Sequence, residues 1–147
     1  MKISGICLII LVCAVALVPG VVAQNVDNTG NGYTVHPAYN LNLPSAIHPM
    51  SSGMITLGES DYYFRYVSPG TTAVVPDLNW GDTADSLTLS ISTPNGSLGP
   101  FNDASDGIDN ARIYLHISNP SGLPSGIWEF RIYGEQVSGS QSYTFTV

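Results

Sequence analysis

The sequence has only two cysteines, Cys7 and Cys13, and both lie in an apolar run near the N-terminus. The rest of the chain therefore cannot form a disulfide bond. That run, residues 6–18, follows a charged start and precedes small residues that end at Ala23. A charged start, a short apolar core and a final alanine are typical of a secretory signal peptide. The run is shorter than the ~20 apolar residues of a spanning helix, which makes a retained anchor the less favoured alternative. We predict a cleaved signal peptide over residues 1–23 and a secreted or cell-surface protein.

Positive charge is nearly absent past residue 23, where the only cations are Arg65, Arg112 and Arg131. All eleven acidic residues lie in this part, so three cations against eleven anions give it a formal charge of −8. A surface of this charge repels phosphate backbones, which excludes nucleic acid as a partner. A second long apolar run and a convincing helical period are also lacking. We therefore expect no membrane span after signal cleavage and no helical domain.

Residues 24–52 are rich in asparagine, glycine, proline and serine, a composition typical of loops and linkers. We interpret this segment as an irregular polar arm, with one short strand near Tyr33–Val35. The remaining residues, 53–147, then form one domain. A domain of about 100 residues is of ordinary size, and it must rely on its hydrophobic core because it has no disulfide bond.

From Gly53 onward, short runs of alternating apolar and polar residues are separated by turn residues. In residues 86–92, Leu87, Leu89 and Ile91 share one face, while serine and threonine share the other. This period of two indicates half-buried strands, and several such strands between turns indicate an all-β sandwich or barrel. The residues expected in the core are Val74, Leu78, Trp80, Leu87, Leu89, Ile91, Ile113, Leu115, Ile117, Trp128, Phe130, Ile132, Tyr143, Phe145 and Val147. One further run has two distinct faces, formed by Tyr62, Phe64 and Tyr66 and by Tyr63, Arg65 and Val67.

The order of these runs resembles a known secreted module. Residues 60–96, SDYYFRYVSPGTTAVVPDLNWGDTADSLTLSISTPNG, show a Tyr/Phe strand, a strand ending in Leu-x-Trp and an alternating leucine strand that closes in Pro-x-Gly. Together with LPSGIWEFRIYG and SYTFTV, this order is similar to the bacterial pre-peptidase C-terminal domain family. The resemblance implies a jelly-roll-like antiparallel β-sandwich over residues 53–147. It also implies a role in secretion, substrate binding or attachment, usually beside a secreted peptidase or other exported enzyme, with no catalytic residues of its own.

Five aspartates gather around one predicted hairpin. Asp82 and Asp85 precede the strand at residues 86–93, and Asp103, Asp106 and Asp109 follow the returning strand, so both groups are expected at the same end. Calcium takes about six to eight oxygen ligands, and turning loops supply carboxylates and carbonyls for it. Aspartate and glycine are also ordinary turn residues, since the aspartate side chain bonds its own backbone. A calcium site and a solvated turn are therefore both open interpretations.

Catalytic patterns are not found in the sequence. It contains no Gly-x-Ser-x-Gly elbow, its glutamates are scattered singly, and His36, His48 and His116 lack the paired spacing of a zinc site. His116 faces outward with Arg112 on one predicted strand, and Glu129 faces outward on another. If these strands are neighbours, the face holds either a Glu129–Arg112 cross-strand pair or a glycan- or protein-binding patch.

Taken together, these patterns predict a secreted, non-catalytic binding or adhesion module with an extracellular protein or a polysaccharide as its partner. Calcium is its candidate cofactor, and it would stabilise the acidic loops. The alternatives are a structural subunit of an extracellular assembly and an accessory domain of a secreted peptidase or other exported enzyme. The oligomeric state is left open. Asn95-Gly96-Ser97 is a glycosylation sequon, and Pro94-Asn95-Gly96 predicts the hairpin turn that would expose it.

Overall fold

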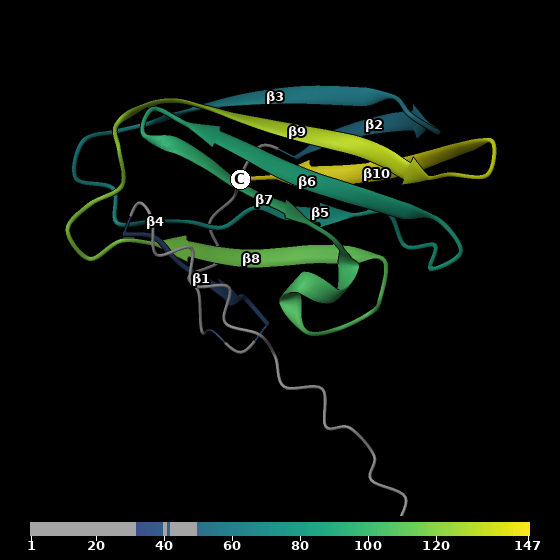
Figure 1. Cartoon of the computed structure of the whole chain (residues 1–147), viewed down its shortest axis with the longest axis horizontal. Helices are drawn as coiled ribbons and strands as arrows, with labels where there is room; N and C mark the ends of the chain where they lie inside the picture. The colour runs from purple at the N-terminus through teal and green to yellow at the C-terminus, as the bar shows by residue number, and fades with distance from the viewer. Residues whose placement is uncertain (1–31, 40, 42–49) are drawn as a thin grey trace, which may run out of the picture.

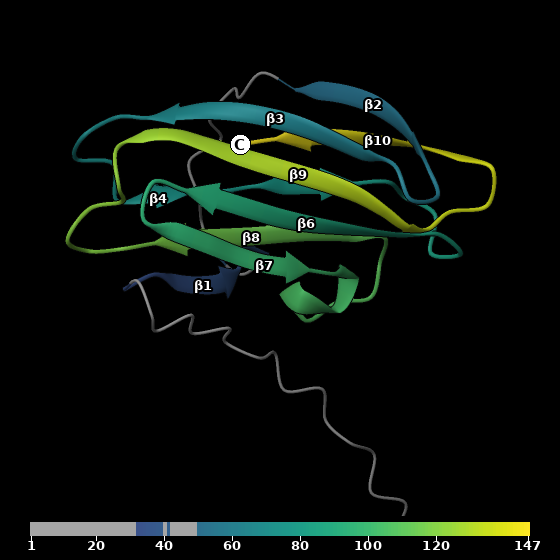
Figure 2. The ribbon, with the colours of Figure 1, turned by 45° about the horizontal axis from the view of Figure 1, so that its top comes forward.

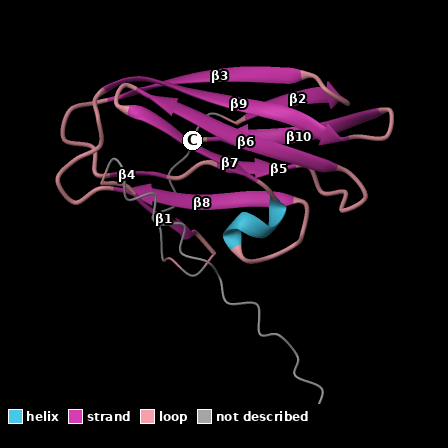
Figure 3. Ribbon diagram, viewed as in Figure 1, coloured by secondary structure: helices cyan, strands magenta, loops and turns pink. Residues whose placement is uncertain are grey.

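The chain folds as an all-β sandwich of two antiparallel sheets in this computed structural model, which describes residues 32–39, 41 and 50–147 (Figures 1 and 3). The predicted signal peptide and most of the predicted arm lie outside the described residues. The strands are β1 (Thr34–Pro37), β2 (Ser51–Thr56), β3 (Ser60–Val67), β4 (Ala73–Val74), β5 (Asp77–Asn79), β6 (Ser86–Thr93), β7 (Gly96–Phe101), β8 (Arg112–Ser118), β9 (Gly126–Gln136) and β10 (Ser140–Thr146). A short 3-10 helix, η1 (Asp103–Asp106), lies in the connection between β7 and β8. The described part of the chain contains no helix that could span a bilayer.

The two sheets have different strand orders. The larger sheet runs β1-β8-β5-β10-β2, with β4 also paired to β8, and the smaller sheet runs β3-β9-β6-β7. β2 and β3 are consecutive in the chain but belong to different sheets, so the turn between them carries the chain from one layer to the other (Figure 2). All the strand pairs are antiparallel, as the alternating pattern and the short turns predicted.

The core between the sheets is built from the predicted inward faces. Leu89 of β6, Leu115 of β8 and Phe130 of β9 are each 0% exposed, and neighbouring alternate residues of the same strands are buried with them. Val74 and Val147 are half-buried and pack against this core. Fully burying one such side chain stabilises the fold by about 1.5–3 kcal/mol, so these faces supply the main driving force for folding.

The sandwich begins earlier in the chain than the composition predicted. β1 lies within the segment interpreted as the polar arm, where one short strand was expected, and it pairs with β8 in the register Val35↔Ile117. Tyr33 and Val35 are buried in the core, at 3% and 1% exposure. The boundary predicted at residue 53 falls inside β2. Both β1 and the start of β2 are therefore parts of the sandwich and not of a separate linker.

The β6–β7 hairpin has the predicted turn. Thr93 and Gly96 face each other across its end, and Pro94 and Asn95 form the exposed tip. The Asn95 sequon is therefore accessible on the surface, as predicted. β7 runs back along β6 and ends at Phe101, so η1 and the loop after β5 lie at the same end of the sandwich (Figure 1).

Candidate binding face

Asp103, one of the five predicted calcium ligands, holds the loop between η1 and β8. Its Oδ1 accepts hydrogen bonds from the backbone N–H groups of Asn110 and Arg112, each at 3.1 Å, and its Oδ2 accepts one from Ala111 at 2.8 Å. Ala111 has a positive φ of 61°, which is unfavourable for a residue with a side chain. Three hydrogen bonds to one carboxylate therefore fix a turn that the local sequence does not favour by itself.

Asp106 serves the same loop from inside the protein. It is 2% exposed, and it accepts hydrogen bonds from the backbone N–H of Tyr114 at 2.8 Å and of Ile108 at 3.1 Å. Burial raises the pKa of the Asp106 carboxyl, and these N–H groups lower it in part. Asp109 is exposed, and the neighbouring Asp103 carboxyl raises its pKa through a hydrogen bond and charge repulsion.

The other two predicted ligands have separate local contacts. Asp82 accepts a hydrogen bond from the backbone N–H of Ala84 at 2.9 Å. Asp85 is 8% exposed and accepts one from Ser138, in the turn between β9 and β10, at 2.9 Å. The loop between β5 and β6 and the loop between β7 and β8 lie at the same end of the sandwich, as expected (Figure 1). Even so, no group of three or more His, Cys, Asp or Glu in the described residues is arranged to hold a metal ion. The contacts resemble those of structured turns, and calcium binding stays a prediction.

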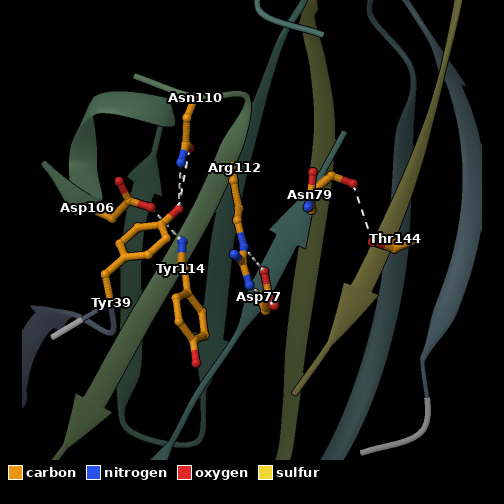
Figure 4. A network of polar contacts seen from close by, with 8 residues as sticks. All are labelled: Tyr39, Asp77, Asn79, Asp106, Asn110, Arg112, Tyr114 and Thr144. Carbon is orange, nitrogen blue, oxygen red and sulfur yellow. Dashed lines mark hydrogen bonds and ion pairs between the residues drawn. The ribbon is translucent and has the colours of Figure 1, made fainter. Parts of the chain in front are cut away.

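The outer face of the larger sheet carries an ordered set of polar side chains. The strand registers place Ser52, Thr144, Asn79 and Arg112 side by side, so they form one row across β2, β10, β5 and β8. Adjacent strands are about 4.8 Å apart, so the row extends roughly 14 Å. We call this surface the polar face; Figure 4 shows the part of it around β5 and β8.

Arg112 is held rigidly at one end of the row. Its Nε and Nη2 donate to the two carboxylate oxygens of Asp77 at 2.7 and 2.6 Å, which raises the pKa of the guanidinium. The guanidinium carbon also lies 4.4 Å from the centre of the Tyr114 ring and 5.4 Å from that of Tyr39. The Glu129–Arg112 pair, expected only if the two strands were neighbours, does not form, because β8 and β9 belong to different sheets.

Tyr39 and Tyr114 form an aromatic shelf beside Arg112. Their rings meet edge to face with 5.2 Å between centroids. The Tyr39 hydroxyl also exchanges hydrogen bonds with the side chain of Asn110, at 3.1 and 3.3 Å, which ties the shelf to the loop that Asp103 organises (Figure 4). Burial raises the pKa of Tyr39, so its hydroxyl is a neutral donor and acceptor at physiological pH.

A shallow groove of about 500 Å³ lies at the other end of the row. Its lining residues are Ser52, Gly53, Asn79, Trp80, Gly81, Ser142, Tyr143 and Thr144. The buried Gln141 side chain donates to the backbone carbonyl oxygens of Trp80 and Ser142 at 2.9 and 2.7 Å, which fixes the floor of the groove. The exposed groups are mainly hydroxyls and one amide, and they are carried on paired strands rather than on a loop.

Histidine contributes to the same sheet but not to the groove. His36 of β1 and His116 of β8 are opposite each other in the strand register. Burial lowers the pKa of His116, and the charge of nearby His36 lowers it further. His48 lies outside the described residues. Two histidines without a third ligand in the described residues do not form the kind of site that zinc prefers.

The sequence interpretation identified Arg112 as outward-facing but missed Ser52, Asp77, Asn79 and Thr144. Their signal was weak, since each is a polar residue at an ordinary outward position of a strand. Only the pairing of strands far apart in the chain brings them into one row. No protein-family model and no curated protein matches the chain, so the resemblance to the pre-peptidase C-terminal domain stays a prediction and the geometry must carry the functional argument.

Proposed function

We propose that the chain is a secreted, non-catalytic binding module that holds a neutral polysaccharide on its polar face. The observation that carries this proposal is the continuous surface formed by the hydroxyl- and amide-lined groove, the row that ends at Arg112, and the shelf of Tyr39 and Tyr114. Such a surface is long and shallow, which suits an extended polymer better than a small molecule.

The chemistry of the surface matches that of a sugar chain. Serine, threonine and asparagine side chains each offer donors and acceptors for sugar hydroxyls. The ring faces of tyrosine offer apolar area with a polar tip, which suits the mixed polar and apolar surface of a sugar ring. A formal charge of −8 past residue 23 disfavours an anionic polymer, which is why we specify a neutral one.

The surface is also rigid before it binds. The bidentate Asp77–Arg112 pair and the bonds of Gln141 hold side chain and backbone in place. A preorganised site loses less conformational entropy on binding, so modest contacts can give useful affinity. The carboxylates of Asp103 and Asp106 accept backbone hydrogen bonds instead of facing this surface as a catalytic pair, which favours binding over hydrolysis as the proposed role.

The antiparallel sandwich is the fold that the resemblance to the pre-peptidase C-terminal family implies, and this agreement supports an attachment role. In such a role, the module would keep itself, or an enzyme that it accompanies, close to a polymer outside the cell. An extracellular protein partner is the competing hypothesis, and absence of retention on every polysaccharide would favour it.

The test is retention of the purified protein on a panel of insoluble and soluble neutral polysaccharides, followed by titration of the best binder. Asn79→Ala removes one amide from the centre of the row, and losing one hydrogen bond of about 0.5–1.5 kcal/mol weakens binding several-fold. Ser90→Ala on the outer face of β6 is the matched control, because it removes one hydroxyl from the opposite sheet. Absence of retention on every polysaccharide, or equal effects of the two substitutions, would contradict the proposal.

A further inference from the structure

β3 is an edge strand. It is eight residues long, and among the described strands it pairs only with β9 and lies outermost in the smaller sheet (Figure 1). Its register with β9 is continuous from Ser60 to Val67, with no bulge, and the strand contains neither proline nor lysine. Natural edge strands are usually shortened, bulged or marked by such residues, because a free row of backbone N–H and C=O groups pairs readily with another strand.

The outer face of this strand is strongly apolar. Tyr62, Phe64 and Tyr66 are 52%, 65% and 63% exposed, and Ile127 of β9, the register partner of Tyr66, is 65% exposed. Single exposed apolar residues are common on protein surfaces, but four neighbours along one edge are characteristic of an interaction surface. We call these four residues the aromatic edge.

The other face of β3 carries two opposite charges. Asp61 and Arg65 are half-buried, lie four residues apart on the same side, and have Tyr63 between them. Asp61 also accepts a hydrogen bond from the Tyr143 hydroxyl at 2.5 Å, but it has no ion-pair partner in the described residues. The other two arginines of the described residues already have partners. Arg112 is paired with Asp77, and Arg131 donates a hydrogen bond to Ser60 and lies over the Tyr133 ring. Within the described residues, Arg65 makes neither a hydrogen bond nor an ion pair with a side chain. A charge on this side of an edge strand normally discourages pairing, unless the incoming strand supplies the opposite charge.

We propose that two copies of the chain pair through β3 as a symmetric dimer, with the strands antiparallel and the two-fold axis passing beside Tyr63. The two smaller sheets then join into one continuous sheet of eight strands. Asp61 of each copy faces Arg65 of the other, and this ion pair occurs twice. On the outer side, Tyr62 of each copy faces Phe64 of the other, so the aromatic edges merge.

The charges select this register among the symmetric ones. An axis beside Asp61 places the two Asp61 carboxylates opposite each other, and an axis beside Arg65 places the two guanidinium groups together. An axis beside Phe64 leaves Asp61 opposite Val67 and Arg65 opposite Tyr63. Like charges directly opposite in a sheet are destabilising, and of these four registers only the one about Tyr63 places Asp61 of each copy opposite Arg65 of the other.

The dimer leaves the polar face free. That face belongs to the other sheet, and a two-fold axis perpendicular to the sheets directs both polar faces to the same side. Two sites on one side can hold one polymer together, which raises the overall affinity without a new contact to the ligand. The dimer does not depend on the proposed polysaccharide, because it is argued from residues of β3 and β9, which belong to the other sheet.

The experiment measures mass against protein concentration by sedimentation equilibrium. The unmodified protein should change from monomer to dimer as concentration rises, and Arg65→Asp should stay monomeric because each copy then presents two like charges. Asp61→Arg should also stay monomeric. An equimolar mixture of these two variants should dimerise again, because every charge in a mixed pair then faces its opposite.

Ser97→Asp is the control for an added aspartate, since it places a carboxylate on β7, at the opposite edge of the same sheet. It should dimerise like the unmodified protein. If either charge variant fails to fold, Phe64→Lys, whose side chain points outward, provides the independent test and should be monomeric. A protein that stays monomeric at every concentration, a dimer that survives Arg65→Asp or Phe64→Lys, or a mixture without recovery would overturn the proposal.

Discussion

Replacing Asp103 by alanine tests whether this carboxylate serves the backbone or a metal ion. The substitution removes three hydrogen bonds, from the backbone N–H groups of Asn110, Ala111 and Arg112. Hydrogen bonds to a charged group contribute about 1.5–3 kcal/mol each when buried, and less when water can replace the acceptor. The bond to Asn110 is exposed and the other two are partly buried. After discounting for exposure, we expect a total loss of roughly 2–4 kcal/mol in the free energy of unfolding.

The assay is urea-induced unfolding of the Asp103→Ala variant and the unmodified protein, each with excess chelator and then with calcium. For a domain of this size, 1 kcal/mol corresponds to about 4 °C in melting temperature, so thermal scans should show a decrease of roughly 8–16 °C. The decrease should be the same with chelator, because the bonds to the backbone require no metal. Asp109→Asn is the control in the same loop. It should cause no loss, since it removes a charge that the Asp103 carboxylate repels.

Two results would refute this reasoning. A decrease smaller than that of an ordinary surface substitution, about 0.5 kcal/mol, would mean that the loop does not depend on the Asp103 carboxylate. A large decrease with calcium but none with chelator would mean that the residue acts as a metal ligand. If the unmodified protein melts at the same temperature with calcium and with chelator, the calcium prediction itself is removed.

Two further predictions concern the Gly53 site and the ionisation of Asp106. Gly53→Ala should destabilise the fold by about 1–3 kcal/mol in urea unfolding, because a methyl group there overlaps the Tyr143 ring. The control is Ser52→Ala on the outer side of β2, which should change the stability little. Gly58→Ala in the β2–β3 turn is unsuitable as a control, because its positive φ of 78° would itself cause strain. Burial raises the pKa of Asp106 in the folded state above its unfolded value of about 3.8. The protonated carboxyl therefore contributes stability that is fully present below pH 3.8 and is lost as the pH rises through the folded-state pKa. Unfolding measured over the acidic range should therefore show a pH dependence that Asp106→Asn removes, and an unchanged profile in that variant would contradict the assignment.

The core could be predicted from the sequence because it depends on local alternation. Leu87, Leu89 and Ile91 repeat with a period of two between polar residues, and every one of them is 0% exposed. The same rule could not decide the orientation of β3, where aromatic residues occur on both faces. Tyr63 points inward, where its hydroxyl forms a 2.8 Å hydrogen bond with that of Tyr143. This contact joins strands of different sheets, so no local sequence pattern could predict it.

The polar face was largely hidden from sequence reasoning for the same physical reason. Arg112 was identified as outward-facing, but the one partner considered for it, Glu129, lies on β9, whereas the structure pairs it with Asp77 of β5. The choice depends on which strands become neighbours, and strand order is a long-range property of the chain. The acidic loops show the complementary limit. Their position at one end followed from the hairpin, whereas the hydrogen bonds of Asp85 to Ser138 and of Asp106 to Tyr114 required the folded arrangement of distant segments.

β10 lies between β5 and β2 in the larger sheet, so the last strand of the chain joins two segments that are made much earlier. Among the described strands, β2 pairs only with β10, so we expect its Ile55 side chain to become buried only after residues 140–146 have been synthesised. Closure of so many long-range pairs is intrinsically slow. We therefore expect the larger sheet of a nascent chain to close only after residues 140–146 have been synthesised.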